Sequence, residues 1–225
     1  MLSELHGLNR EHFKKNKKIF NHFFKEYPEE IQKITLKKGE YLVQENERYK
    51  GVFFINKGIA IKEVLLKNGK AQGFRLTNEF EFIGTTALTG LFRSPYDIRS
   101  LTDMECYKLS DTLLNQIISE YPTYLYEGIQ VDSYINYQRM KFHTGKVEER
   151  IIYNIIELAE HFGEKINNNV LLPNIITQEL LAILSSTTRE YVARIIAALK
   201  SVQILDTKKR NIIINDIGKL GNLIY

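Results

Sequence analysis

Three charged side chains near the C-terminus have the types and the spacing that recognition of DNA bases requires. Arg189, Glu190 and Arg194 lie in the stretch SSTTREYVARIIAALK, residues 185–200. A guanidinium can donate two parallel hydrogen bonds to O6 and N7 of guanine, and a carboxylate can accept one from N4 of cytosine. At about 100° per residue on a helix, these charges lie opposite, or at the edge of, an apolar side that holds Val192, Ile195, Ile196 and Leu199. The pattern predicts a helix that packs on its own domain and presents a flat, charged face to a DNA groove.

Two structural explanations of these residues compete with base recognition. Thr187 and Glu190 fit a capping box, which would make Glu190 a stabiliser of the helix N-terminus. Glu190 and Arg194 are four residues apart, so they could instead form a surface ion pair worth about 0.2–0.5 kcal/mol. The neighbouring sequence favours base recognition, because another helix is predicted at 177–184, a tight turn before the helix at 188–200.

The other elements of this region follow the order of a winged helix-turn-helix. KVEERIIYNIIELAEHFG, residues 146–163, predicts an amphipathic helix that Gly163 ends as a C-terminal cap. KINNNVLLP predicts a strand pair about an asparagine turn, and ILDTKKRNIIIND predicts two strands around a basic loop. The predicted order is therefore helix, hairpin, helix, helix and hairpin.

The N-terminal half has a different periodicity. From about Ile34 to Lys108, turn residues such as Gly39 and Gly58 divide the sequence into short apolar runs, and Asn68-Gly69 is a strong hairpin signal. Several short strands at near-regular spacing predict a β-sandwich or barrel. With the helical segments on either side, the fold class is α+β: an N-terminal β-barrel of the double-stranded β-helix or jelly-roll type, a long helix and a winged helix-turn-helix.

A long helix is predicted between these two parts. The helical pattern begins at Asp111, and Pro122 predicts a break in it. Beyond the break, residues recur at alternating spacings of four and three, as in the seam of a two-stranded coiled coil; they are Tyr124, Gly128, Val131, Ile135, Gln138 and Phe142. An amphipathic helix lying on its own barrel fits the pattern equally well. The predicted domains are a sensing barrel with an N-terminal helical segment at 1–121, a dimerisation helix at 122–145 and a DNA-binding domain at 146–225.

These motifs resemble the Crp/Fnr family of transcription regulators. ITQELLAILSSTTREYVARIIAALK is similar to the family's helix-turn-helix motif, with matches at Ile176, Thr177, Leu181, Ala182, Thr188, Arg189, Glu190, Val192 and Arg194. The resemblance implies base contacts by Arg189, Glu190 and Arg194 and phosphate contacts by Thr177 and Thr188. In the basic loop, we expect further phosphate contacts from Lys208, Lys209 and Arg210. Ser185 departs from an aliphatic residue of the motif, and Ser186 from a turn glycine that tolerates positive φ.

The resemblance extends into the barrel but not to all of its ligand chemistry. KKGEYLVQENE is similar to a family pattern with glycine at the position of Asn46, a residue that also tolerates the left-handed region. EFIGTTALTGLFRSPYDIRS is similar to the family's nucleotide phosphate cassette, which implies an effector site with Phe82, Ile83, Gly84, Thr85, Thr86, Arg93 and Ser94. Thr85 stands where cyclic AMP binders have a glutamate on the ribose. Ser94 falls near the position of the phosphate-binding arginine, with Arg93 one residue away. We therefore expect that cyclic AMP is not the effector.

Composition excludes several other classes of protein. One cysteine, Cys106, excludes an intramolecular disulfide and an iron–sulfur cluster held by four thiolates of this chain, and we expect it to be a small buried apolar residue. No apolar stretch approaches the length of a membrane span, so we expect a cytoplasmic protein without a membrane partner. The five histidines lack metal-ligand spacing, and no phosphate loop or nucleophile motif is present, so no metal, cofactor or enzymatic activity is expected. A net charge of +4 does not by itself imply nucleic acid.

The leading hypothesis is a homodimeric, sequence-specific transcription regulator that binds an inverted repeat in double-stranded DNA. RNA polymerase is an expected partner if the protein activates transcription, and the barrel would sense an effector. The alternative is an effector-binding module that acts through a protein partner without specific DNA binding, which only the Ser185-Ser186 turn supports.

Overall fold

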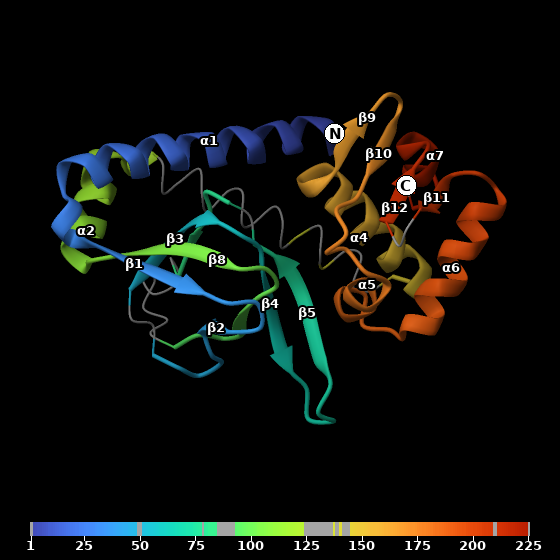
Figure 1. Cartoon of the computed structure of the whole chain (residues 1–225), viewed down its shortest axis with the longest axis horizontal. Helices are drawn as coiled ribbons and strands as arrows, with labels where there is room; N and C mark the ends of the chain where they lie inside the picture. Colours follow the sequence, from blue (N-terminus) through green and yellow to red (C-terminus); the bar gives the residue numbers. More distant parts are fainter. Residues whose placement is uncertain are drawn as a thin grey trace. The chain divides into compact units, whose positions relative to one another are not determined.

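Two compact units make up the chain (Figure 1). The computed structural model describes residues 2–48, 51–77, 79–84, 93–123, 137, 140, 145–208 and 211–224. The first unit contains the described residues up to 67 and from 75 to 123. The second contains those from 137 onward, and residues 68–74 of a hairpin are grouped with it.

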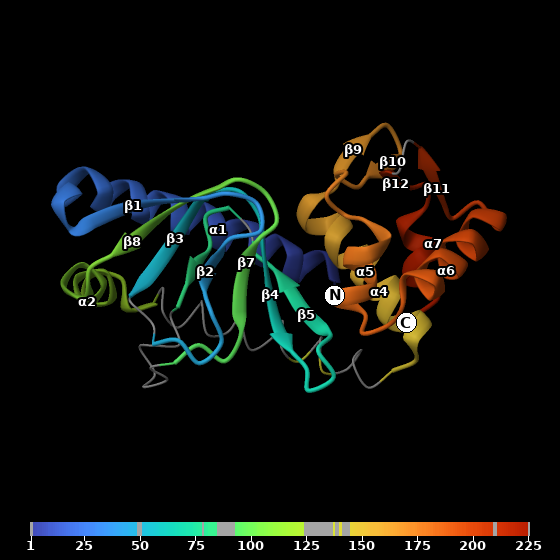
Figure 2. The same cartoon turned by 60° about the horizontal axis from the view of Figure 1, so that its bottom comes forward.

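Two four-stranded sheets face each other in the N-terminal half of the chain (Figure 2). One has the order β1-β8-β3-β6, with β1 (Ile31–Leu36), β8 (Met104–Leu109), β3 (Val52–Lys57) and β6 (Phe82–Ile83). The other has the order β2-β7-β4-β5, with β2 (Tyr41–Val43), β7 (Asp97–Ser100), β4 (Ala60–Leu65) and β5 (Ala71–Leu76). This order, which pairs strands from distant parts of the sequence, confirms the predicted jelly roll, although the two sheets do not close into one barrel.

The core of the roll lies between the two sheets. Alternate residues of each strand face inward, and the buried set is Val43, Phe53, Ile55, Ala60, Ile83, Ile98, Met104 and Cys106. Cys106 is fully buried, and this burial raises the pKa of its thiol to about 12. It therefore packs as an apolar residue, as predicted from the sequence, and carries no reactive thiolate at neutral pH.

Two helices cover the outer side of the sheet that contains β3 and β8 (Figure 1). α1 (Leu2–Glu26) and α2 (Asp111–Glu120) share a second apolar cluster with that sheet, in which the rings of Phe20 and Phe54 stack with centroids 3.9 Å apart. The Ser110 side chain caps α2 by accepting from the Leu113 N–H. α2 ends at Glu120, two residues before Pro122, as the predicted break requires.

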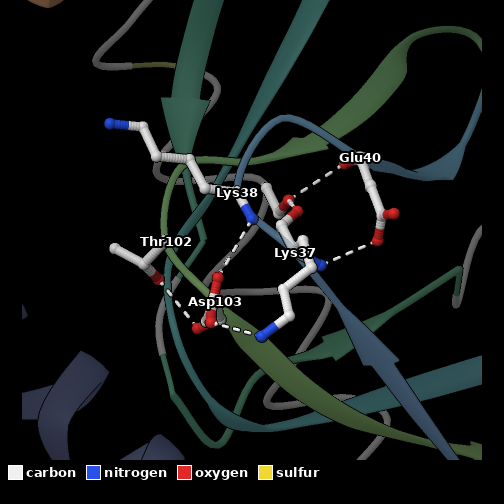
Figure 3. Close-up of polar contacts among 6 residues, drawn as sticks. Lys37, Lys38, Glu40, Thr102 and Asp103 are labelled. Atoms are coloured by element: carbon white, nitrogen blue, oxygen red, sulfur yellow. Dashed lines mark hydrogen bonds and ion pairs between the residues drawn. The ribbon is translucent and has the colours of Figure 1, made fainter.

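A network of polar contacts joins the turn after β1 to the turn before β8 (Figure 3). The Lys37 amino group donates to the Asp103 carboxylate at 2.9 Å, and the Lys38 N–H donates to its other oxygen at 3.2 Å. The Lys37 N–H donates to the Glu40 carboxylate at 2.7 Å. Gly58 is required nearby, because it has φ +102° and a Cβ there would lie 2.7 Å from the Asp103 carbonyl oxygen. These contacts fix the end of the roll at which β1 turns into β2.

The second unit contains four helices and a four-stranded sheet among its described residues. The helices are α4 (Val147–Phe162), α5 (Gln178–Leu184), α6 (Arg189–Ser201) and α7 (Ile217–Gly221). The sheet has the order β11-β12-β10-β9, with β11 (Leu205–Lys208), β12 (Asn211–Ile214), β10 (Asn169–Leu171) and β9 (Glu164–Ile166). The predicted winged helix-turn-helix order is confirmed, and α7 is an addition that the sequence pattern did not predict.

Gly163 ends α4 as predicted, but for a different physical reason. Its φ of −72° lies outside the left-handed region, so the helix does not end in a left-handed cap. A Cβ at this position would lie 2.2 Å from the Ala159 carbonyl oxygen and 2.4 Å from Cγ1 of Val170. Glycine is therefore required by the close approach of β10 to the end of α4.

The predicted dimerisation segment falls largely outside the described residues. All six seam positions lie there: Tyr124, Gly128, Val131, Ile135, Gln138 and Phe142. Within the segment, residues 137 and 140 are helical, and the exposed fractions of Tyr137 and Met140 are 57% and 63%. The seam stays a prediction.

Candidate DNA interface and effector site

Hydroxyl side chains cap both helices of the helix-turn-helix. The Thr177 hydroxyl accepts from the Leu180 N–H at 3.1 Å at the start of α5, and the Thr188 hydroxyl accepts from the Tyr191 N–H at 3.2 Å at the start of α6. The proposed cap at Thr187 is wrong, because the N-cap residue is Thr188. A hydroxyl that accepts a backbone hydrogen bond keeps its own proton, so each threonine can still donate to a phosphate oxygen.

The turn between α5 and α6 keeps its shape without a glycine. Ser186 has φ +50°, in the left-handed region. Ser185 is fully buried; its hydroxyl accepts from the Asn154 amide at 3.0 Å, and its carbonyl accepts from Nε of Arg150 at 3.0 Å. Both donors belong to α4. Ser185 stands where the family motif has an aliphatic residue, and its polar groups are satisfied by Asn154 and Arg150 of α4.

The two faces of α6 separate as the sequence pattern predicts. Val192, Ile196 and Leu199 are buried, and Ile195 is half-buried. Arg189, Glu190 and Arg194 are exposed on the other side. The pKa of Glu190 is lowered, first by its own backbone N–H and then by the Thr188 hydroxyl. Glu190 thus also stabilises the helix N-terminus, which agrees in part with the capping explanation.

The wing is tied to the end of α6. The amino group of Lys200, in the last turn of α6, lies 3.0 Å from the Asp206 carboxylate and donates to the Thr207 hydroxyl at 2.9 Å. Both partners lie on β11, which ends in the exposed Lys208. Lys209 and Arg210 lie outside the described residues. Lys208 therefore extends from a strand whose position is fixed relative to α6.

The effector residues predicted in the roll do not all face one another. Ile83 is buried in the core between the sheets, Phe82 packs against the cluster under α1, and Gly84 has φ +88°. Thr85 and Thr86 lie outside the described residues. Arg93 is exposed, and its guanidinium donates to the Asn46 carbonyl at 2.7 Å. Ser94 is buried, and its hydroxyl donates to the Tyr96 carbonyl at 2.5 Å.

Three charged side chains that the sequence analysis missed meet beside this region. The Glu81 carboxylate, 6% exposed, binds the Lys62 amino group at 3.0 Å through one oxygen and the Arg75 guanidinium at 2.9 Å through the other. Lys62 is paired with Ile98 in the sheet, and opposite residues of an antiparallel pair share a face. Because Ile98 belongs to the core, Lys62 points into the roll. The available signal was its position on the same strand face as Ala60 and Val64, two residues before and after it.

The backbone beside Glu81 is held from α1. Phe80 has φ +66°, which is unusual for an aromatic residue. Its carbonyl accepts from the buried Asn16 amide at 2.7 Å, and the Lys17 amino group lies 4.3 Å from its ring centre. The loop that carries Glu81 therefore has a fixed conformation.

Metal and membrane sites are not indicated by the described part of the chain. Within it, no group of three or more His, Cys, Asp or Glu side chains is placed to hold a metal ion. No helix there combines the length and apolar composition that a membrane span requires. With a single cysteine, the chain cannot supply four thiolates to an iron–sulfur cluster.

A jelly roll followed in one chain by a winged helix-turn-helix is the arrangement of a transcription regulator with a sensing domain and a DNA-binding domain. Residues 33–121 match the family model described as a cyclic nucleotide-binding domain. Residues 149–223 match the model described as a Crp-like helix-turn-helix domain. The chain belongs to the Crp/Fnr family of transcription regulators.

Relatives and solved structures agree with this family. A protein of Porphyra purpurea named as an HTH-type transcriptional regulator, ycf28, is 24% identical over 200 residues, which cover 86% of this chain and 82% of the relative. A cyclic nucleotide-binding domain containing protein from Listeria monocytogenes EGD-e has a TM-score of 0.74 and 22% identity, with 89% of this chain and 98% of that chain covered. FixK2 from Bradyrhizobium japonicum has a TM-score of 0.72 and 15% identity, with 87% and 98% covered. At these identities the two structures support the fold.

Proposed function

We propose that the protein binds an inverted repeat in double-stranded DNA as a homodimer, with α6 in the major groove. The exposed charged face of α6, capped and fixed against its own domain, carries this proposal. Arg189, Glu190 and Arg194 read base edges. Thr177, Thr188 and the wing residues Lys208, Lys209 and Arg210 contact phosphates. Each helix-turn-helix of a two-fold dimer would meet one half-site, about one helical turn from the other.

Base contacts and phosphate contacts can be separated by measuring specificity at fixed salt. A target duplex is first selected by the wild-type protein from random-sequence DNA. Arg194→Ala should weaken binding to this duplex by about 1–3 kcal/mol per half-site and weaken binding to random DNA much less. Lys208→Ala should weaken both about equally and make the salt dependence shallower by about one phosphate per subunit.

The ratio of specific to non-specific affinity decides between the two explanations of α6. If alanine at Arg189, Glu190 and Arg194 leaves that ratio unchanged, the charged face only stabilises the helix and the proposal fails. The turn at Ser186 no longer supports the alternative function without specific DNA binding, because Ser186 adopts the conformation that glycine would provide. RNA polymerase is the proposed protein partner if the regulator activates transcription.

We propose further that the effector of the roll is not cyclic AMP. Thr85 cannot replace a carboxylate that accepts two ribose hydroxyls. The Arg93 guanidinium donates to the Asn46 carbonyl, and the largely buried cations Lys62 and Arg75 bind Glu81. A cyclic phosphate would therefore have to displace contacts that these cations already make. Calorimetry should show no micromolar affinity for cyclic AMP, and such an affinity would overturn this proposal.

A further inference from the structure

We propose that Tyr191 and Glu148 are positioning residues that hold Arg194 ready to contact a base. The Arg194 guanidinium carbon lies 4.3 Å from the centre of the Tyr191 ring, one turn away on α6. The Tyr191 hydroxyl donates to the Glu148 carboxylate. The three side chains thus form a chain of contacts from α4 to the exposed face of α6. This inference rests on the proposed DNA-binding function.

Glu148 is a firm anchor for the tyrosine. It lies in the first turn of α4, and Ile151, Ile152 and Ile155 farther along that helix are buried and hold it in the domain. The Tyr191 hydroxyl is the main cause of the lowered pKa of Glu148, to which the Arg194 charge also contributes. The same bond raises the pKa of Tyr191. Both side chains therefore keep their hydrogen-bonded forms, an ionised carboxylate and a neutral phenol, at neutral pH.

A cation–π contact suits an arginine that must donate to a base. The ring contacts the guanidinium carbon at 4.3 Å, and the five N–H donors of an arginine exceed the two that a fork to guanine requires, so a guanidinium held by this ring can still donate to a base. A free arginine would lose side-chain entropy when it becomes fixed on DNA. Contact with Tyr191 already restricts the Arg194 side chain in the free protein. Fixing this side chain on DNA therefore costs less binding free energy.

A double-mutant cycle tests whether Tyr191 acts through Arg194. The variants are Tyr191→Leu, which removes the ring, Arg194→Ala, and the two combined, each measured against the selected duplex and random DNA. Tyr191→Leu should weaken binding to the selected duplex about two- to fivefold per half-site, the range of an exposed cation–π contact. It should have almost no further effect when Arg194 is already alanine. Relaxed base preference should appear at the position that Arg194→Ala also relaxes.

Two variants separate the ring from its anchor. Tyr191→Phe keeps the ring and loses the bond to Glu148, so its loss of affinity should be smaller than that of Tyr191→Leu. Tyr107→Phe is the matched control, because it removes a tyrosine–glutamate hydrogen bond, 3.0 Å to Glu105, in the roll. This control should leave DNA binding unchanged.

The outcomes distinguish this inference from the function on which it rests. If the wild-type protein selects no inverted repeat, the proposed function fails, and the role of Tyr191 fails with it. If the wild type and Arg194→Ala behave as proposed but the effects of Tyr191→Leu and Arg194→Ala are additive, only the assignment of Tyr191 is overturned. A Tyr191→Leu variant that binds like the wild type overturns it as well.

Discussion

At the scale of single residues, the two serines of the helix-turn-helix turn have opposite roles. Ser186 is exposed with φ +50°, a conformation that costs an L-residue about 1–2 kcal/mol. Ser185 is buried and accepts from the Asn154 amide. Substitution at neighbouring positions should therefore change stability in opposite directions.

Ser186→Gly should raise the free energy of unfolding by about 0.5–1 kcal/mol. Glycine adopts positive φ without steric cost, although its greater freedom in the unfolded chain offsets part of the gain. Ser185→Ala should lower the free energy by about 1–3 kcal/mol, because the Asn154 amide loses its acceptor. Urea unfolding of both variants checks the prediction, and a destabilised Ser186→Gly would contradict it.

Asp103 should make stability depend on pH in the acid range. The Lys37 amino group, followed by the Lys38 N–H, lowers the pKa of Asp103 in the folded protein. A carboxyl with a lowered folded pKa stabilises the protein fully above its unfolded pKa, and this contribution disappears as the pH falls through the folded pKa. The difference in melting temperature between the wild type and Asp103→Asn should therefore be constant near neutral pH and shrink below about pH 4. A difference that grows in acid would contradict this assignment.

At the scale of elements, the Glu81 carboxylate connects β4, β5 and the loop before β6. Lys62 and Arg75 are only 11% and 16% exposed, and both bind the Glu81 carboxylate. Removing one partner of a buried ion pair leaves an uncompensated charge, which costs more than the pair contributes. The cluster should therefore control both the stability of the roll and its affinity for anions.

Glu81→Gln should lower the free energy of unfolding by about 3–5 kcal/mol. Added inorganic phosphate should recover part of the loss, because Lys62 and Arg75 then lack this carboxylate. Glu63→Gln is the matched control: Glu63 is also buried but binds a single cation, Arg99, at 2.5 Å and 2.9 Å. The measurement is the rise in melting temperature with phosphate. Equal rises in both variants would show that phosphate does not replace Glu81.

At the scale of the whole molecule, the seam of the proposed dimerisation helix, residues 122–145, should control assembly. Replacing Ile135 by glutamate should give monomers and sharply weaken binding to the selected duplex, because a charge would enter the proposed interface. Tyr137→Glu is the control, since Tyr137 lies off the seam and is 57% exposed. Sedimentation at micromolar concentration measures the state of assembly. A wild-type protein that stays monomeric with DNA present would contradict the proposed dimer.

The sequence by itself determined the elements whose causes are local. The helices predicted at 177–184 and 188–200 are observed at Gln178–Leu184 and Arg189–Ser201, because capping and helical periodicity depend on residues within one turn. The hairpin at Asn68-Gly69 follows from turn chemistry in the same way, with Gly69 at φ +77°. The spacing of Arg189, Glu190 and Arg194 predicted the charged face of α6.

Only the tertiary structure decided which polar groups meet. Glu81 binds Lys62 across 19 residues of sequence, Ser185 meets Asn154 across 31, and Tyr191 bonds Glu148 across 43. Sequence patterns reveal the type and periodicity of such side chains but not their partners, because a pairing exists only where the folded chain removes both groups from water together. For this reason the exposed charged residues of α6 could be predicted from the motif, whereas the contact of Tyr191 with Glu148 and the position of the Glu81 carboxylate inside the roll could not.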